Sequence, residues 1–170
     1  QQLYEGVEIG EEGPTGLITY MRTDSVNISA EALEAAKLKI LIEFGKNYAL
    51  ETPRVFKTKS KSAQEAHEAI RPADPNRDPE VLKKHLDPRQ FKLYDLIWRR
   101  FMASQMPEAI VASTSVDIKA AEYILRANGS QLKFDGFLKV YPLKIEEVIL
   151  PELKEKQKLE PEKISADEHQ

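Results

Sequence analysis

The spacing of apolar residues changes at Pro107, and this change constrains the fold more than any other feature of the 170-residue chain. Before it, residues 88–105 place apolar side chains at intervals typical of an amphipathic helix, and Asp87 and Pro88 form a helix start. After it, apolar and polar residues alternate from Ile110 onward, which predicts strands. The sequence therefore predicts an α+β chain, with a mainly helical part followed by an antiparallel β part.

Two further helices are predicted in the first part. One has Ser29 as its N-cap and ends at Gly45. The other begins at Ser62, where Glu65 completes a capping box, and it includes His67. These helices lead us to expect a helical domain over residues 1–107.

The β part contains a strong turn signal at Asn128 and Gly129. It predicts a hairpin that joins a strand ending near residue 127 to one over residues 131–141. We expect this β portion to cover residues 108–150 and a charged linker to follow over residues 151–170, which are poor in large apolar groups.

Composition excludes several classes of function. The chain has no cysteine, so disulfides, thiolate nucleophiles and cysteine-based zinc sites are excluded, and this fits a reducing cytoplasm. No apolar run reaches the length needed to cross a bilayer. The sequence begins without Met and ends on a charged tail, so we expect a segment of a larger protein.

The net charge of −3 does not support DNA binding by overall attraction. Charge is uneven, however, because Lys57, Lys59 and Lys61 share one face of an extended segment. Such a strip can contact phosphates without reading sequence. The alternative is a solvated surface arm.

Residues 16–25 are predicted to be extended, which places Tyr20, Arg22 and Asp24 on one side and Thr19 and Thr23 on the other. Arg22 can hold a phosphate through paired hydrogen bonds while the Tyr20 oxygen lies within reach of phosphorus. Asp24 is placed to orient Arg22. The alternative is an ordinary strand with an exposed Arg–Asp pair and a half-buried tyrosine.

His67 and Glu68 raise the question of a metal site. The metalloprotease pattern needs a second histidine where Arg71 stands, so that site is rejected. A lone histidine on a helix is more often structural or exposed than functional, and that alternative stays open on the residues alone.

Three stretches together resemble the bacterial type IA DNA topoisomerases. Residues 18–25 (ITYMRTDS) resemble the active-site signature of the family, residues 63–72 (AQEAHEAIRP) resemble its second signature, and residues 93–106 are similar to a helix that follows. The resemblance implies that Tyr20 is the nucleophile that forms a transient 5′-phosphotyrosine link to one DNA strand. It implies that Arg22 stabilises charge at the phosphate, that His67 contacts the phosphate or its hydrogen-bond network, and that Arg71 is a structural pair for Glu68 or Glu65.

The resemblance also implies an architecture and partners. The helical domain resembles the winged-helix, catabolite-activator type of fold, and the β portion resembles part of a hinge-like arch whose other strands are absent here. An unpaired strand edge then offers a place for a second copy. Expected partners are single-stranded or negatively supercoiled DNA and the remaining domains of the enzyme, without a membrane, in the bacterial cytoplasm and nucleoid.

In that family, Mg²⁺ is bound by acidic residues of a separate domain. This chain has no Asp-x-Asp pair, so we expect no metal site on it and no relaxation of DNA by it alone. Two other classes remain. One is a non-catalytic DNA-binding helical module that holds phosphate through Lys57, Lys59 and Lys61, and the other is a structural domain in which Tyr20 is packed.

Overall fold

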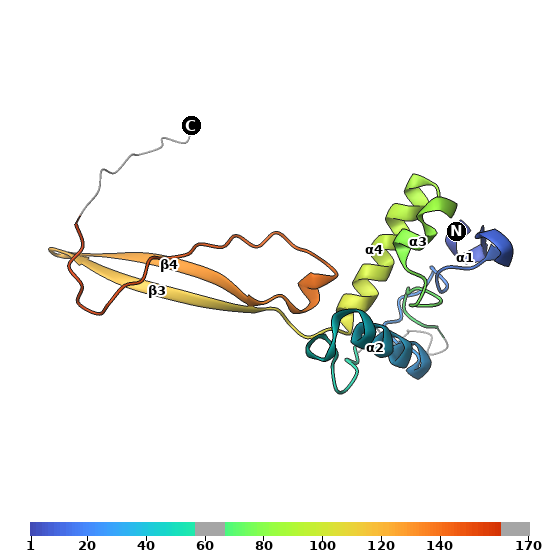
Figure 1. Cartoon of the computed structure of the whole chain (residues 1–170), viewed down its shortest axis with the longest axis horizontal. Coiled ribbons are helices and arrows are strands. Elements are labelled where there is room, and N and C mark those ends of the chain that lie inside the picture. The colour runs from blue at the N-terminus through green and yellow to red at the C-terminus, as the bar shows by residue number, and fades with distance from the viewer. Residues whose placement is uncertain (57–66, 161–170) are drawn as a thin grey trace. The chain divides into compact units, whose positions relative to one another are not determined.

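The computed structural model describes residues 1–56 and 67–160, which combine helices and strands as the sequence predicts (Figure 1). They divide into two compact units. The first contains residues 1–110 and 132–145, and the second contains residues 111–131 and the chain from residue 146 onward. The predicted β portion, residues 108–150, is thus shared between the two units.

The first unit holds the helices and a small hairpin. The strands of the hairpin, β1 and β2, pair antiparallel with Val7 opposite Thr15. The helices and strands of this unit are α1 (Gln2–Glu5), β1 (Val7–Glu8), β2 (Pro14–Thr15), α2 (Ala30–Phe44), α3 (Pro79–Leu82) and α4 (Pro88–Ser104). Short 3₁₀ helices lie at Gly10–Glu12, Lys46–Tyr48, Lys83–His85 and Gly136–Lys139.

The helix ends follow their predicted caps. Ser29 caps α2 by accepting a hydrogen bond from the Ala32 N–H, and Gly45 ends the helix with a φ of +88°, a conformation that favours glycine. Asp87 caps α4 and forms a reciprocal capping box with Gln90. These predictions are confirmed because each depends on contacts within one helical turn.

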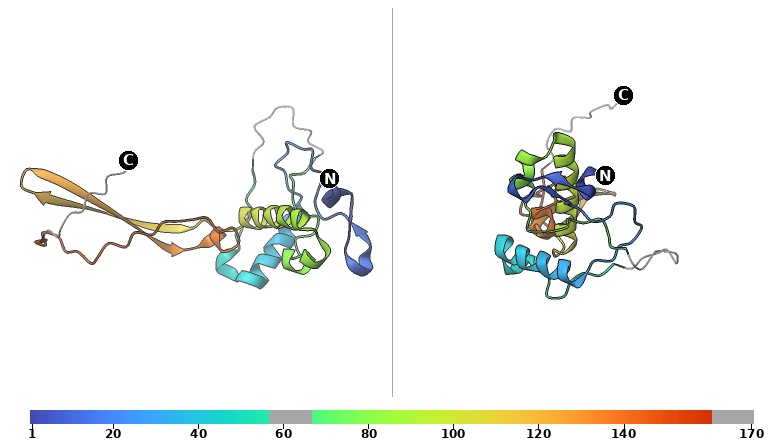
Figure 2. Two further views of the ribbon diagram at one scale, coloured as in Figure 1. Left: turned by 90° about the horizontal axis from the view of Figure 1, so that it is seen from above. Right: turned by 90° about the vertical axis from the view of Figure 1, so that its right-hand side faces the viewer.

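Helix α4 contributes several buried side chains to the hydrophobic core of this unit. Tyr94, Trp98 and Met102 are buried there, and α2 lies beside α4 (Figure 2). The Trp98 indole N–H donates to the Pro75 carbonyl oxygen at 2.9 Å, and the Tyr94 hydroxyl donates to that of Arg77 at 2.8 Å. These two buried polar groups of α4 therefore have partners, as burial requires.

The helix predicted at His67 is wrong over the described part. Residues 67–71 are not helical, because their backbone pairs with distant segments instead. The Ala69 N–H donates to the Asn27 carbonyl oxygen at 2.8 Å, and the Thr19 N–H donates to that of Arg71 at 2.9 Å. The rest of the predicted helix, from Ser62 to residue 66, lies outside the described residues.

The regular alternation predicted for residues 16–25 is also wrong. Leu17 and Ile18 are adjacent, yet both are buried in the core. Only Ile18 forms a β-bridge, to Pro72, and the chain bends at positions 19, 21 and 22. Because the paired segment is so short, side chains after residue 18 do not keep the two faces of a strand.

Two long strands form an antiparallel ribbon, β3 (Ile110–Ala120) and β4 (Tyr123–Phe134) (Figure 1). Arg126 on β4 reaches across to Asp117 on β3, with 2.7 Å between the guanidinium Nε and a carboxylate oxygen. The ribbon turns at Ala121, which has a φ of +54°. The first predicted strand therefore ends earlier than expected, and the second begins earlier.

The turn predicted at Asn128 and Gly129 is wrong, since both residues lie inside β4. A third segment approaches the ribbon here, where Ser130 and Val148 exchange two backbone hydrogen bonds of 2.8 and 3.1 Å. A Cβ on Gly129 would lie 2.8 Å from both the Val148 carbonyl oxygen and Leu150 Cγ. The glycine permits this close approach rather than a turn.

Candidate active site around Tyr20

Tyr20 lies in a small aromatic cluster. Its ring centre is 5.3 Å from that of Tyr4, edge to face, and 5.6 Å from that of His67. The Tyr20 and His67 side chains are both half-buried. The fold therefore brings together two of the predicted site residues, which are 47 positions apart, at a place that solvent reaches.

Thr19 holds the two segments at this point. Its hydroxyl donates to the Ala69 carbonyl oxygen at 2.7 Å and accepts from the Arg71 N–H at 2.9 Å. Its own N–H donates to the Arg71 carbonyl oxygen at 2.9 Å. Thr19 thus ties the backbone next to Tyr20 to the backbone that follows His67.

Glu68 and Arg71 form an ion pair beside the cluster, as predicted for Arg71. Glu68 also accepts a hydrogen bond of 2.7 Å from the N–H of Ser29, the cap of α2. Burial by itself raises the pKa of Glu68, but the hydrogen bonds from Ser29 and Arg71 and the Arg71 charge outweigh it, so the pKa lies below its ordinary value.

Arg71 is nearly buried, and it also donates a hydrogen bond to the backbone. Its guanidinium donates to the Pro72 carbonyl oxygen at 2.8 Å. The two terminal nitrogens of this guanidinium thus bond groups within the chain, as in a structural ion pair.

Arg22 and Asp24 are exposed, and they do not pair with each other. Within residues 1–56 and 67–160, Arg22 makes no hydrogen bond or ion pair, which leaves its guanidinium available to an anion. The predicted orienting role of Asp24 is not seen, because water competes with such a pair at an exposed site. Thr23 instead accepts a hydrogen bond of 3.0 Å from the Ser25 N–H and braces the loop.

The predicted lysine strip, Lys57, Lys59 and Lys61, lies outside the described residues. Within the described ranges, no three His, Asp or Glu side chains lie close enough to share a metal ion. No step proposed for this chain uses these carboxylates as metal ligands.

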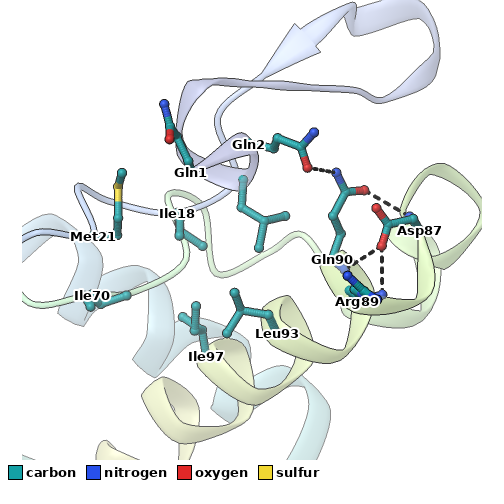
Figure 3. A pocket seen from close by; sticks show the side chains of 11 residues that line it. Gln1, Gln2, Ile18, Met21, Ile70, Asp87, Arg89, Gln90, Leu93 and Ile97 are labelled. Carbon is teal, nitrogen blue, oxygen red and sulfur yellow. Dashed lines mark hydrogen bonds between the residues drawn. The ribbon is translucent and has the colours of Figure 1, made fainter.

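A cavity of about 460 Å³ lies between α1, α4 and the segments next to Tyr20 and His67 (Figure 3). Ile18, Met21 and Ile70 line one side of it, and Leu93 and Ile97 of α4 line the other. Neither Tyr20 nor His67 lines it. The cavity is therefore an apolar neighbour of the cluster and not the place where those two side chains meet.

The contact of Tyr4 with Tyr20 and the hydrogen bonds of the Thr19 hydroxyl were not predicted from the sequence. No local signal marks Tyr4, because it reaches Tyr20 only through the turn of the β1–β2 hairpin. Thr19 does sit inside the ITYMRTDS stretch, but a hydroxyl that pairs with a segment 50 residues away has no sequence pattern of its own.

Comparison with known proteins adds a second kind of evidence. A statistical model of the family described as DNA topoisomerase matches residues 1–170. The chain belongs to this family.

Named relatives agree with the topoisomerase assignment. DNA topoisomerase 1 of Helicobacter pylori strain J99 is 46% identical over 169 residues, covering 99% of this chain and 23% of that protein. DNA topoisomerase 1 of Xylella fastidiosa strain Temecula1 is 49% identical over 142 residues, covering 83% and 17%. The full-length topoisomerase I structure from Thermotoga maritima matches with a TM-score of 0.74 and 36% identity, covering 90% and 24%. The chain spans less than a quarter of the length of these relatives.

Proposed function

We propose that this chain supplies the nucleophile of a type IA DNA topoisomerase, and that the nucleophile is Tyr20. The Tyr20 oxygen attacks a phosphodiester of one DNA strand, forms an O–P bond and displaces the 3′ oxygen, which takes up a proton. The strand is then held by a 5′-phosphotyrosine, another strand passes, and the reverse attack by the 3′-hydroxyl reseals it. The linkage conserves the bond energy, so no ATP is needed.

The observation that carries this proposal is the packing of a half-buried Tyr20 against His67. Arg22, two residues after Tyr20, is exposed and has no partner among the described residues. A phenol is a weak nucleophile at neutral pH and needs an activating environment. Arg22 is proposed to stabilise the charge that develops around phosphorus, and His67 to hydrogen-bond the phosphate or its network.

Two other tyrosines support this choice by contrast. The Tyr94 hydroxyl is committed to a carbonyl, and burial raises the pKa of Tyr94 far above its ordinary value. The Tyr48 hydroxyl donates to an Asp135 carboxylate oxygen at 2.6 Å, and that hydrogen bond, followed by burial, raises the pKa of Tyr48. Both hydroxyls are engaged in hydrogen bonds within the chain, which makes them less available for attack on an external phosphate.

Substitution of Tyr20 in the intact enzyme tests the proposal. Tyr20→Phe is expected to abolish covalent capture of a labelled single-stranded oligonucleotide while its non-covalent affinity stays within about 2-fold, since only the attacking oxygen is lost. Tyr48→Phe is the matched control and is expected to retain capture. Undiminished capture by the Tyr20 variant would refute the assignment.

Arg22→Ala separates this proposal from the DNA-binding module. For a nucleophile site, the cleavage rate is expected to fall by about 10²-fold or more while binding changes far less. If the variants at Tyr20 and Arg22 lose only DNA affinity, the non-catalytic binding module is favoured.

The rest of the enzyme completes the proposal. We infer that negatively supercoiled DNA is the substrate in the bacterial cytoplasm and nucleoid, and that Mg²⁺ is bound by residues outside this chain. The chain alone, added to supercoiled plasmid with Mg²⁺, is then expected to leave the topoisomer distribution unchanged. Relaxation by the chain alone would show that the missing parts are not required.

The finer architecture also belongs to the proposal. It comprises a winged-helix, catabolite-activator-like domain over residues 1–107, an arch portion over residues 108–150 and a linker over residues 151–170, with Lys57, Lys59 and Lys61 along the DNA backbone. Replacing the three lysines together by Gln is expected to weaken binding and reduce its salt dependence. An unchanged salt dependence would remove them from the interface.

A further inference from the structure

We infer that Thr19 is a positioning residue for this chemistry, because its hydroxyl sets the register between the backbone that carries Tyr20 and the backbone that carries His67. This inference rests on the proposed function for its catalytic consequence. The proposed role of Thr19 acts through its hydrogen bonds to the backbone of Ala69 and Arg71 and not through contact with DNA.

The first step is that the Thr19 hydroxyl replaces a missing β ladder. Within the described residues, the two segments share one β-bridge, Ile18 to Pro72. It consists of two backbone hydrogen bonds of 2.9 Å, from the Thr19 N–H to the Arg71 carbonyl oxygen and from the Ala73 N–H to the Leu17 carbonyl oxygen. Beyond Thr19 the chain bends, and within the described residues the direct backbone pairing of these two segments ends there. The hydroxyl continues it by bonding both the Ala69 carbonyl oxygen and the Arg71 N–H.

The second step is proximity along the chain. Thr19 directly precedes Tyr20, and its partner Ala69 is two residues after His67. A shift in this pairing would therefore change the 5.6 Å separation of the Tyr20 and His67 rings, because few residues lie between the paired positions and the two rings. Errors of about 1 Å in such geometry can cost on the order of 10²-fold in rate.

The third step is that the far side of the His67 segment is anchored independently. Glu68 accepts from the Ser29 N–H, and the Ala69 N–H donates to the Asn27 carbonyl oxygen. The start of α2 thus holds the segment from the other side. Loss of the Thr19 hydroxyl is expected to leave the Tyr20 backbone held to this segment only by the two backbone hydrogen bonds of the bridge, while the segment itself keeps its place.

The test is made in the intact enzyme with Thr19→Val, which keeps the shape of the side chain and removes the hydroxyl. The rate of covalent capture of an oligonucleotide is expected to fall about 10–100-fold while non-covalent affinity stays within about 2-fold. Thr19→Ser, which restores the hydroxyl, is expected to recover the rate to within about 3-fold. A purely structural role would not produce this split between rate and affinity.

Thr15→Val is the matched control. Thr15 is also half-buried in the first unit, but its hydroxyl donates only to the nearby Gly13 carbonyl oxygen at 3.1 Å. It is expected to leave capture unchanged. Equal losses at positions 15 and 19, or an undiminished rate for Thr19→Val, would overturn the inference.

A crystal structure of the Thr19→Val enzyme separates failure of the inference from failure of the proposed function. The Tyr20 and His67 rings are expected to move apart or to become disordered relative to each other. If the unsubstituted enzyme forms no adduct at Tyr20, the proposed function fails. If, in addition, the separation of the Tyr20 and His67 rings is the same in the variant, the positioning role is refuted as well. If the adduct forms and the rings do not move, only the inference fails.

Discussion

The two compact units of this chain use their apolar residues in opposite ways. In the helical unit, Tyr94, Trp98 and Met102 are at most 5% exposed. In the ribbon, Tyr123, Ile124 and Leu125 are all more than half exposed. The difference shows that a helix can bury its one apolar stripe against other elements of the same unit. A ribbon of two strands has no second layer that could cover either of its faces.

The two units also differ in where the hydrogen-bond partners of their polar side chains come from. Distant segments supply partners in the helical unit, as Pro75 does for Trp98. In the ribbon, cross-strand neighbours supply them, as Asp117 does for Arg126. Stability in the first unit therefore depends on tertiary packing, and in the second on pairwise contacts at the surface.

Trp98→Ala should have the largest effect of the changes that test this contrast. Removing a buried indole from α4 is expected to lower the free energy of unfolding of the helical unit by about 3–5 kcal/mol. Denaturant unfolding measures the loss, and amide exchange assigns it to residues. Equal loss of protection in residues 111–131 would show that the two units unfold together and would break the comparison.

Gly129→Ala is expected to have the next largest effect, confined to the ribbon. The added Cβ meets the Val148 carbonyl oxygen and Leu150 at 2.8 Å, so the third segment must move away. A destabilisation of about 1–3 kcal/mol is typical of such overpacking. Faster exchange at the amides of Ser130 and Val148 would report it, and Gly13→Ala is a contrasting control, because a Cβ there meets no atom within 4 Å but has a strained φ of +67°.

Glu68→Gln is expected to lower stability at pH 7 by about 1–2 kcal/mol, because it leaves the nearly buried Arg71 without its counter-charge. The pKa of Glu68 is lower in the folded chain than in the unfolded chain, so its stabilisation is complete above the ordinary glutamate pKa of about 4.3. It is lost as the pH falls through the folded pKa.

The stability difference between Glu68→Gln and the unsubstituted chain should therefore shrink on acidification. Thermal unfolding at pH 7 and below pH ~4 measures it. A difference that does not depend on pH would assign the loss to packing rather than to the ionised carboxylate.

Tyr123→Ala is expected to have the smallest effect, because its side chain is 66% exposed on the ribbon. A change within about 0.5 kcal/mol is typical of such surface positions. A loss as large as that of Trp98→Ala would show that the ribbon face is covered in solution, for instance by a second copy, and sedimentation of the chain would then test this.

The caps of α2 and α4 and the family could be predicted from the sequence, because both depend on short stretches. The caps at Ser29 and Asp87 and the stripe on α4 are local, so the helices follow from residues within a turn of one another. The ITYMRTDS and AQEAHEAIRP stretches were sufficient to indicate the family, and the active-site roles of Tyr20 and His67 stay predictions.

Only the tertiary structure decided how these residues are held. A capping box at Ser62 favoured a helix through His67, but long-range pairing with Thr19 and Asn27 takes the backbone groups of residues 69 and 71 and excludes it there. Asn128 and Gly129 have the composition of a turn, but the approach of Val148 and Leu150 uses the glycine inside a strand. In both places hydrogen bonds between distant segments outweigh a local preference, and no window of sequence contains both partners.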